Sequence, residues 1–104
     1  MARVAFKMKL LPGNEAEYKK RHDEIWPELS ALLKSTGISE YSIFLDEKTN
    51  SLFGFLKAED QTLLDSLSKH VIMQKWWVYM SDIMESNPDH SPLSIALKEV
   101  FYLA

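Results

Sequence analysis

The sequence contains no cysteine among its 104 residues. That absence excludes disulfide bonds, thiolate metal sites and cysteine nucleophiles together, and it suits a protein kept in a reducing compartment. Basic residues are not in excess either, and the formal net charge is -3 at pH 7. Nucleic acids and anionic lipids select clustered lysine and arginine, so we expect neither nucleic acid nor membrane as a partner.

Long apolar runs are also missing. The segment MARVAFKMKLL is interrupted by Arg3, Lys7 and Lys9, which leaves no apolar stretch long enough for a signal peptide or a membrane span. We therefore expect a cytoplasmic protein. The three histidines are scattered and no compact carboxylate set accompanies them, so we expect no metal and no cofactor. The length fits a single domain over residues 1–104.

Local patterns predict the secondary structure of the first half. Residues 3–10 alternate apolar and polar side chains, which is the period of a strand. A turn follows at Pro12, and Asn14 is placed to cap a helix over about residues 15–34. Pro27 interrupts that helix, so we expect a kink, or a break with Pro27 in the first turn of a second segment.

This helical segment has an apolar face that begins with two polar-tipped side chains. Helical spacing defines one inward stripe, made of Tyr18, Ile25, Trp26, Leu29, Leu32 and Leu33. His22 lies on the same stripe, one turn after Tyr18. Gly37, which follows the segment, is available for a left-handed cap.

The second half predicts a hairpin, two helical pieces and a last strand. Residues 41–45 and 52–58 read as strands joined by the polar turn DEKTNS. Asp60 is placed to cap the next helix, and a further helical piece runs over about residues 73–84. The segment SNPDHSP reads as a loop, and KEVFYL as the last strand. The order β-α-β-β-α-β predicts an α+β, ferredoxin-like fold.

Both faces of the predicted sheet are apolar, although one layer of helices covers only one of them. On opposite faces, Phe44 opposes Ile43, Phe53 and Phe55 oppose Leu52 and Leu56, and Phe101 and Leu103 oppose Val100 and Tyr102. An exposed apolar face of this size is a liability for a monomer, so we predict a homodimer packed sheet to sheet. The alternative is that the long loop before the last strand folds over the bare face.

His22 and its neighbours are the first candidates for a functional site. A lone histidine on an apolar stripe is often a core residue bonded to the backbone. Here the phenol of Tyr18 lies beside the imidazole on the same helical face, and two adjacent inward-facing polar groups usually line a solvent-filled pocket. Tyr41, the first inward candidate of the hairpin, is placed to face them from the sheet.

The segment KWWVYM contains the next candidates. Adjacent helical residues point about 100° apart, so Trp76 and Trp77 cannot fill one core position. They are either packing residues or the walls of a pocket, where an indole ring suits the C–H face of a sugar. Asp89 and His90 are adjacent in a loop without a nucleophile elbow, which favours a solvated turn.

Several separate blocks together resemble the L-rhamnose mutarotase family over essentially the whole chain. They are YKKRHDEIWPEL, the strand at Tyr41, WWVYM, NPDHSP and the terminal EVFYL. The resemblance implies a dimeric α/β barrel of the ferredoxin-like type. It also implies a cytoplasmic isomerase of rhamnose metabolism that interconverts the α and β anomers of L-rhamnose without a cofactor.

The resemblance further implies roles for individual residues. His22 matches the proton donor, and the sugar-binding positions fall on Tyr18, Tyr41, Trp76 and Trp77. At residue 90 the resemblance leads us to expect asparagine where this chain has histidine, and we assign that residue no role.

The chemistry of anomer exchange fits these residues independently. Opening the hemiacetal moves one proton from the anomeric hydroxyl and brings another to the ring oxygen. The reaction needs a general acid with a pKa near the working pH, and an imidazole with a pKa of about 6.5 meets that need. The group that removes the anomeric proton is not identified by this reasoning, and the alternatives are a tyrosine and a water. Other readings of the same fold are a cofactor-free monooxygenase, a haem-degrading enzyme, or a non-enzymatic dimerisation module.

Overall fold

Four antiparallel strands form one sheet in the computed structural model, which describes residues 2–104. The strands are β1 (Ala2–Lys9), β2 (Ile38–Asp46), β3 (Ser51–Ala58) and β4 (Ile95–Leu97), in the sheet order β2-β3-β1-β4. The helices are α1 (Glu15–Asp23), α2 (Pro27–Ser35), α3 (Gln61–Ser66) and α4 (Val71–Met80), with a 3-10 turn η1 (Leu67–Lys69) after α3. The predicted ferredoxin-like order is confirmed.

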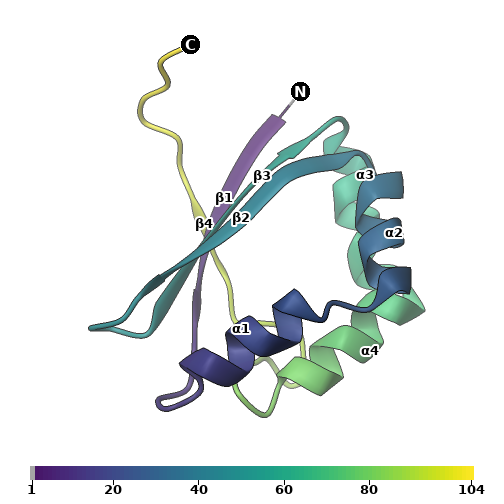
Figure 1. Ribbon diagram of the computed structural model, residues 1–104. Coiled ribbons are helices and arrows are strands. Elements are labelled where there is room, and N and C mark those ends of the chain that lie inside the picture. The colour runs from purple at the N-terminus through teal and green to yellow at the C-terminus, as the bar shows by residue number, and fades with distance from the viewer. Residues whose placement is uncertain (1) are drawn as a thin grey trace.

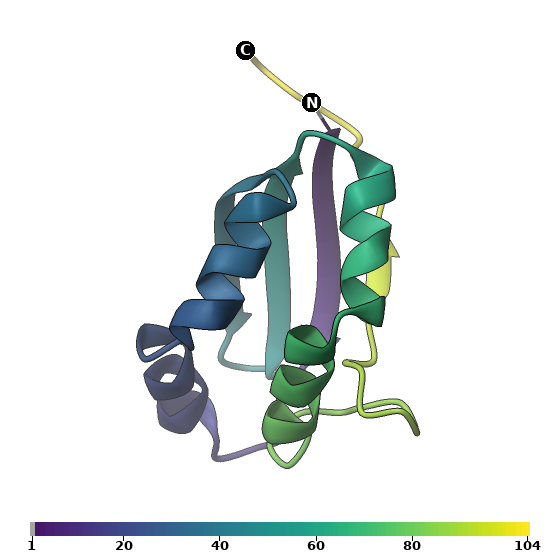
Figure 2. The same cartoon turned by 90° about the vertical axis from the view of Figure 1, so that its right-hand side faces the viewer.

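All helices lie on one face of the sheet, and the other face is bare (Figures 1 and 2). The helix-facing residues of the sheet include Met8 and Leu52, which are buried with Leu29 of α2 and Trp76 of α4. Among residues 2–104, the longest α-helix has ten residues, so none is able to span a bilayer.

The first helical segment breaks before Pro27, which is one of the two predicted outcomes. Helix α1 ends at Asp23, and Pro27 occupies the first turn of α2. The backbone of Trp26 is extended, because a residue before proline avoids the helical region. Asn14 does occupy the N-cap of α1, but its side chain does not cap the helix and instead donates to the carbonyl oxygen of Leu11.

The hairpin and the second helical region also follow the sequence closely. Asp60 caps α3, since its side chain accepts a hydrogen bond from the amide of Thr62 at 2.8 Å. The second helical piece begins at Val71 and ends at Met80, four residues before the predicted end. Gly37 has the left-handed backbone, with φ 84°, that the predicted cap requires.

Gly54 of β3 allows a close approach between β1 and β3. It pairs with Phe6, and a Cβ atom at Gly54 would overlap the phenyl ring of Phe6. The ring therefore lies over the glycine backbone, and it also contacts the ring of Tyr41, edge-on at 6.2 Å between centroids. This pair of rings forms part of the floor of the cavity described below.

The predicted last strand at KEVFYL is wrong. The last strand is Ile95–Leu97, which pairs with β1 over three residues, and residues 98–104 have no regular secondary structure. Arg3 holds the start of this tail, because its guanidinium pairs with Glu99 at 2.6 Å and lies 3.6 Å from the ring centroid of Tyr102. Beyond that point the tail leaves the sheet (Figure 1).

The loop before β4 does not cover the bare face of the sheet, so that alternative is wrong. The amide of Glu85 donates to the carbonyl oxygen of Lys9, which fixes the loop at the end of β1. Ser91 and Pro92 of the loop line the cavity on the helical side instead. Phe44 on the bare face stays 68 % exposed.

Candidate active site

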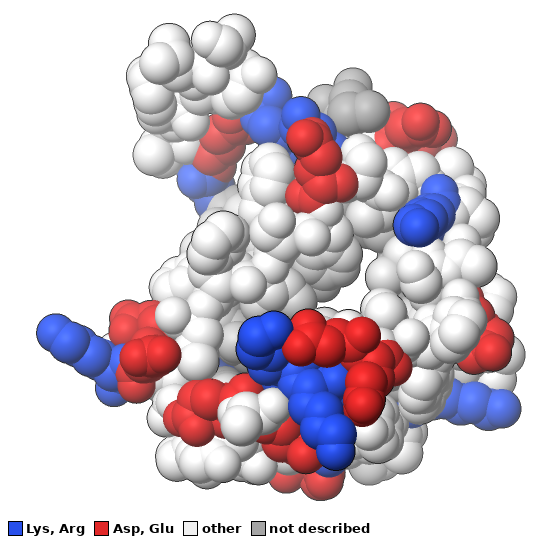
Figure 3. Space-filling model, in the orientation of Figure 1, with Lys and Arg blue, Asp and Glu red and all other residues white. Residues whose placement is uncertain are grey.

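A cavity of about 1270 Å³ lies between the sheet and the helices, and Figure 3 shows it as a hollow with largely uncharged walls. Strands β1, β2 and β3 form its floor, and α1, α2 and α4 form its sides. The five residues singled out in the sequence all line it: Tyr18, His22, Tyr41, Trp76 and Trp77. Residues 58 positions apart in the chain are thus brought to one site.

His22 is held in a defined orientation in the last turn of α1. Its Nδ1 lies 3.0 Å from the carbonyl oxygen of Tyr18. A carbonyl oxygen only accepts, so Nδ1 carries the hydrogen and donates it. The imidazole also stacks on the ring of Tyr18, with centroids 4.3 Å apart, and meets Trp76 edge-to-face at 5.5 Å. Nε2 is left as the nitrogen that can exchange a proton with a ligand.

Burial lowers the pKa of His22 below its usual value of 6.5. The hydrogen bond to the Tyr18 carbonyl and the charge of Asp23 act in the opposite direction but are weaker. The phenol of Tyr18 on α1 stacks on the ring, and α4 presents the uncharged Trp76. The titratable groups that line the same cavity are Tyr41 on β2, the α1 residues Glu15, Lys19 and Asp23, and Lys34, Glu40, Glu47 and Asp65. Near pH 7 the imidazole is therefore neutral, with a lone pair on Nε2.

The two tyrosines stay protonated at the same pH. Desolvation of the phenol raises the pKa of Tyr41 to about 12, although the residue as a whole is 39 % exposed. Burial also raises the pKa of Tyr18 far above its usual range, and the nearby phenol of Tyr41 adds to the shift. Both side chains are therefore hydroxyl groups, able to donate and to accept a hydrogen bond, and neither is a base at neutral pH.

The adjacent tryptophans occupy different environments, as their helical spacing predicts. Trp76 is buried and packs edge-on against Trp26, with centroids 5.0 Å apart. Trp77 is only half-buried. Both line the cavity, so Trp76 is at once a core residue and a wall of the site.

The structure adds aromatic and charged neighbours that the sequence reasoning missed. Tyr79 packs against Trp26 and Trp76, with centroids 5.6 Å from each. Arg21, which leaves the apolar stripe of α1, places its guanidinium over the ring of Tyr79, and its side chain is mostly covered rather than fully solvated. The run WWVYM was the only signal for Tyr79, and no local pattern pairs Arg21 with residues about 60 positions away.

The remaining histidines lie outside the site. His90 is exposed in a left-handed turn with φ 70°, beside Asp89, whose carboxylate accepts a hydrogen bond from the Ser91 amide. The predicted solvated turn is confirmed, and the left-handed backbone suits both histidine and asparagine. His70 caps α4 by accepting from the amide of Ile72. Within residues 2–104, no group of three or more His, Asp or Glu side chains is arranged to hold a metal ion.

The fold and the site define a class: ferredoxin-like α+β proteins with an aromatic cavity between the sheet and its helices. Within that class, residues 3–103 match the family model described as L-rhamnose mutarotase. The chain belongs to the L-rhamnose mutarotase family.

Individual relatives support the same assignment. The L-rhamnose mutarotase of Listeria monocytogenes is 57% identical over 104 residues, covering 100% of both chains. That of Bacteroides thetaiotaomicron is 58% identical over 103 residues, covering 99% of each chain. The crystal structure of L-rhamnose mutarotase from Formosa agariphila superposes with a TM-score of 0.94 at 54% identity and covers 100% of both chains.

An antibiotic biosynthesis monooxygenase shares the fold alone. Its crystal structure has a TM-score of 0.53 and 14% sequence identity, and the match covers 96% of this chain and 99% of that one. The likeness explains why the fold by itself left a monooxygenase reading open. The family match does not favour that alternative, the haem-degrading enzyme or the dimerisation module.

Proposed function

We propose that the protein is an L-rhamnose mutarotase, an isomerase that interconverts the α and β anomers of the sugar within one domain over residues 1–104. The observation that carries the proposal is the His22 imidazole, whose Nδ1 is hydrogen-bonded to the Tyr18 carbonyl and which lines a cavity together with two tyrosines and two tryptophans. A cytoplasmic location, expected from the sequence, stays a prediction.

His22 supplies both proton transfers in this proposal. Neutral Nε2 accepts the proton of the anomeric hydroxyl, and the bond between C1 and the ring oxygen breaks. The imidazolium then gives that proton to the ring oxygen, which leaves an open-chain aldehyde and a neutral histidine. Rotation about the C1–C2 bond and the reverse transfers close the ring on the other face. Each proton taken is returned, so the cycle consumes none.

The neighbours of His22 orient the sugar. The hydroxyls of Tyr18 and Tyr41 are protonated, so each can donate to one sugar oxygen and accept from a sugar hydroxyl. The indoles of Trp76 and Trp77 offer apolar faces to the C–H bonds and the methyl group of the deoxysugar. Holding the ring close to Nε2 adds to the catalysis that proton transfer provides.

Anomer exchange of L-rhamnose, followed by saturation-transfer NMR, tests the proposed activity directly. We expect exchange between the two anomeric protons to accelerate in proportion to protein concentration, because catalysed ring opening adds to the spontaneous rate. Heat-denatured protein at the same concentration is the control. An exchange rate equal to that of the control would remove the proposal.

The pH dependence of the reaction tests the protonation state of His22. We expect kcat/KM to be constant near pH 7 and to fall on acidification, with a midpoint below 6.5, because burial lowers the pKa of the base. Stability should decline over the same range: the unfolded histidine, with a pKa of about 6.5, takes up its proton before the folded one. NMR exchange rates from pH 5 to 8 give the profile. A midpoint above 6.5 would contradict it.

We infer that the protein is a homodimer whose bare sheet faces pack together. Helices cover the other face of the sheet, while Phe44 and Ile95 on the bare face are 68 % and 62 % exposed. Phe101 lies in the tail beyond β4 instead of in the sheet. The register places Phe44 beside Phe53 on the bare face, so the exposed rings are contiguous across β2 and β3. A contiguous apolar face is typical of an interaction surface, and a second copy presents a matching one.

Placing a charge at Phe44 tests the dimer. Phe44→Glu is expected to convert the dimer to a monomer in light scattering at micromolar concentration, because the buried interface would contain two unpaired carboxylates. Val71→Glu is the control: it adds the same charge to an exposed position at the start of α4, on the helical side. A dimeric Phe44→Glu variant, or a monomeric wild type, would contradict the prediction.

A further inference from the structure

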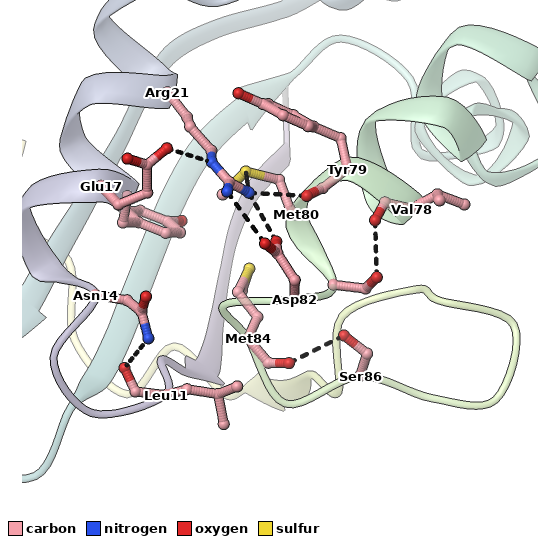
Figure 4. A network of polar contacts seen from close by, with 12 residues as sticks. Leu11, Asn14, Glu17, Arg21, Val78, Tyr79, Met80, Asp82, Met84 and Ser86 are labelled. Atoms are coloured by element: carbon pink, nitrogen blue, oxygen red, sulfur yellow. Dashed lines mark hydrogen bonds and ion pairs between the residues drawn. The ribbon is translucent and has the colours of Figure 1, made fainter.

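The side chain of Arg21 connects α1 to the C-terminal end of α4 (Figure 4). Its Nη1 donates to the carbonyl oxygen of Tyr79 at 2.8 Å and to Oδ1 of Asp82 at 2.9 Å. Nη2 donates to the second oxygen of Asp82 at 3.3 Å, and Nε donates to Glu17 at 2.7 Å. The guanidinium also lies 4.3 Å from the ring centroid of Tyr79.

These contacts make Arg21 a fixed point rather than a surface charge. Its side chain is 10% exposed, while the carboxylates of Asp82 and Glu17 are 65% and 43% exposed. Several contacts on one guanidinium hold it more firmly than a single surface ion pair would. The carbonyl oxygen of Tyr79 is in the last turn of α4, where carbonyls lack intrahelical partners and attract a cation. The two oxygens of Asp82 match the planar fork of the guanidinium, a geometry that a lysine ammonium cannot reproduce.

Helices α1 and α4 also carry the His22 imidazole and the Trp76 indole that it contacts. His22 follows Arg21 directly in α1, and its imidazole meets Trp76 of α4 at 5.5 Å. Tyr79, beneath the guanidinium, packs on Trp76 at 5.6 Å. Helix α1 has nine residues, too few to be stable alone, so tertiary contacts set its orientation. Arg21 provides such a contact one residue from the catalytic side chain.

We propose that Arg21 is a positioning residue, which locks α1 against the end of α4 and so holds the His22 imidazole against Trp76 in the orientation that reaches the sugar. The inference rests on the proposed function, since the geometry that it preserves is that of the proton transfer. In this proposal Arg21 does not contact the sugar, and it affects the reaction only by fixing the position of His22.

Arg21→Gln is the direct test, because it removes the charge and the fork but keeps a polar side chain. We expect kcat to fall by about 10- to 100-fold with a much smaller change in KM, as a misplaced catalytic group costs rate more than binding. We also expect the pKa of His22, followed by NMR titration of its imidazole protons, to rise toward its unperturbed value, because a loosened ring becomes more hydrated.

Three further variants separate positioning from general effects. Lys20→Gln removes the same charge from the same turn of α1 at an exposed position, and it should leave kcat and the His22 titration unchanged. Asp82→Asn should shift both readouts in the direction of Arg21→Gln but less far, since the Tyr79 and Glu17 contacts remain. Arg21→Lys should stay impaired, because a single ammonium cannot span all three partners.

The results of these variants decide whether Arg21 positions His22. A folded Arg21→Gln protein with wild-type kcat and an unchanged His22 titration would overturn the inference. If that variant does not fold, Asp82→Asn decides in its place, and unchanged readouts there would overturn it equally. Wild-type activity in Arg21→Lys would also overturn it. Should the wild type fail to accelerate anomer exchange, the proposed function fails, whereas the His22 titration still tests the positioning contact.

Discussion

Replacing His22 with alanine is expected to lower the catalysed rate of anomer exchange by about 10²- to 10⁴-fold, the usual contribution of a positioned acid–base group. In the proposed mechanism, the variant loses the group that both takes the anomeric proton and returns it to the ring oxygen. The fold should survive, because the imidazole is only half-buried and its one side-chain hydrogen bond is to a carbonyl within its own helix. KM should change much less than kcat.

Saturation-transfer NMR measures this effect, and circular dichroism checks that the variant is folded. His90→Asn is the matched control: it also removes one imidazole, from an exposed turn whose left-handed backbone suits asparagine, and it should retain full activity. If His22→Ala exchanges the anomers at the wild-type rate, proton transfer belongs to another group, and the mechanism proposed above is wrong.

Leu10→Ala is expected to cause the largest loss of stability, about 2–5 kcal/mol. Leu10 is among the largest fully buried side chains, and it belongs to the cluster that joins Tyr18 of α1 to Trp76 of α4. Its backbone is fixed as well, since its amide donates to the carbonyl oxygen of Asn50 at 2.9 Å. Because the surroundings cannot collapse freely, the substitution leaves a cavity beneath the site.

Denaturant unfolding gives the free energy directly, and for a domain with a total of about 5–15 kcal/mol the predicted loss is large. Leu10→Met preserves most of the volume and should cost less than about 1.5 kcal/mol. If Leu10→Ala lowers the free energy of unfolding by less than Leu10→Met does, the cluster relaxes around the smaller side chain. The site would then be less rigid than its packing indicates.

Local sequence signals predicted the features that depend on one or two residues. Pro27 divided the helical segment because proline lacks an amide hydrogen, and Asp60 capped the next helix because its carboxylate reaches the amide of Thr62. His22 and Tyr18 were found together because they lie one turn apart on one helical face. The activity itself came from the family resemblance, since helical spacing does not specify a substrate.

The features that sequence reasoning missed depend on long-range contacts. The apolar run at residues 100–103 has strand composition, yet β4 ends at Leu97, and Arg3 draws the tail aside through Glu99 and Tyr102. Arg21 leaves the apolar stripe, and only the fold brings Asp82 within reach of its guanidinium. In both cases an arginine pairs with residues that are distant in the sequence, and local sequence periodicity does not predict such pairs.

Glycine has no side chain, and at position 54 this limits how the sugar specificity of the enzyme can be redesigned. Because the phenyl ring of Phe6 rests on bare backbone there, any larger residue at position 54 would displace that ring from the floor of the cavity in which we propose that the sugar binds. A smaller residue at position 6, by contrast, would deepen the floor, at the cost of the packing that Phe6 gives to both hydrophobic clusters. A library aimed at bulkier sugars should therefore diversify residue 6 and hold residue 54 constant.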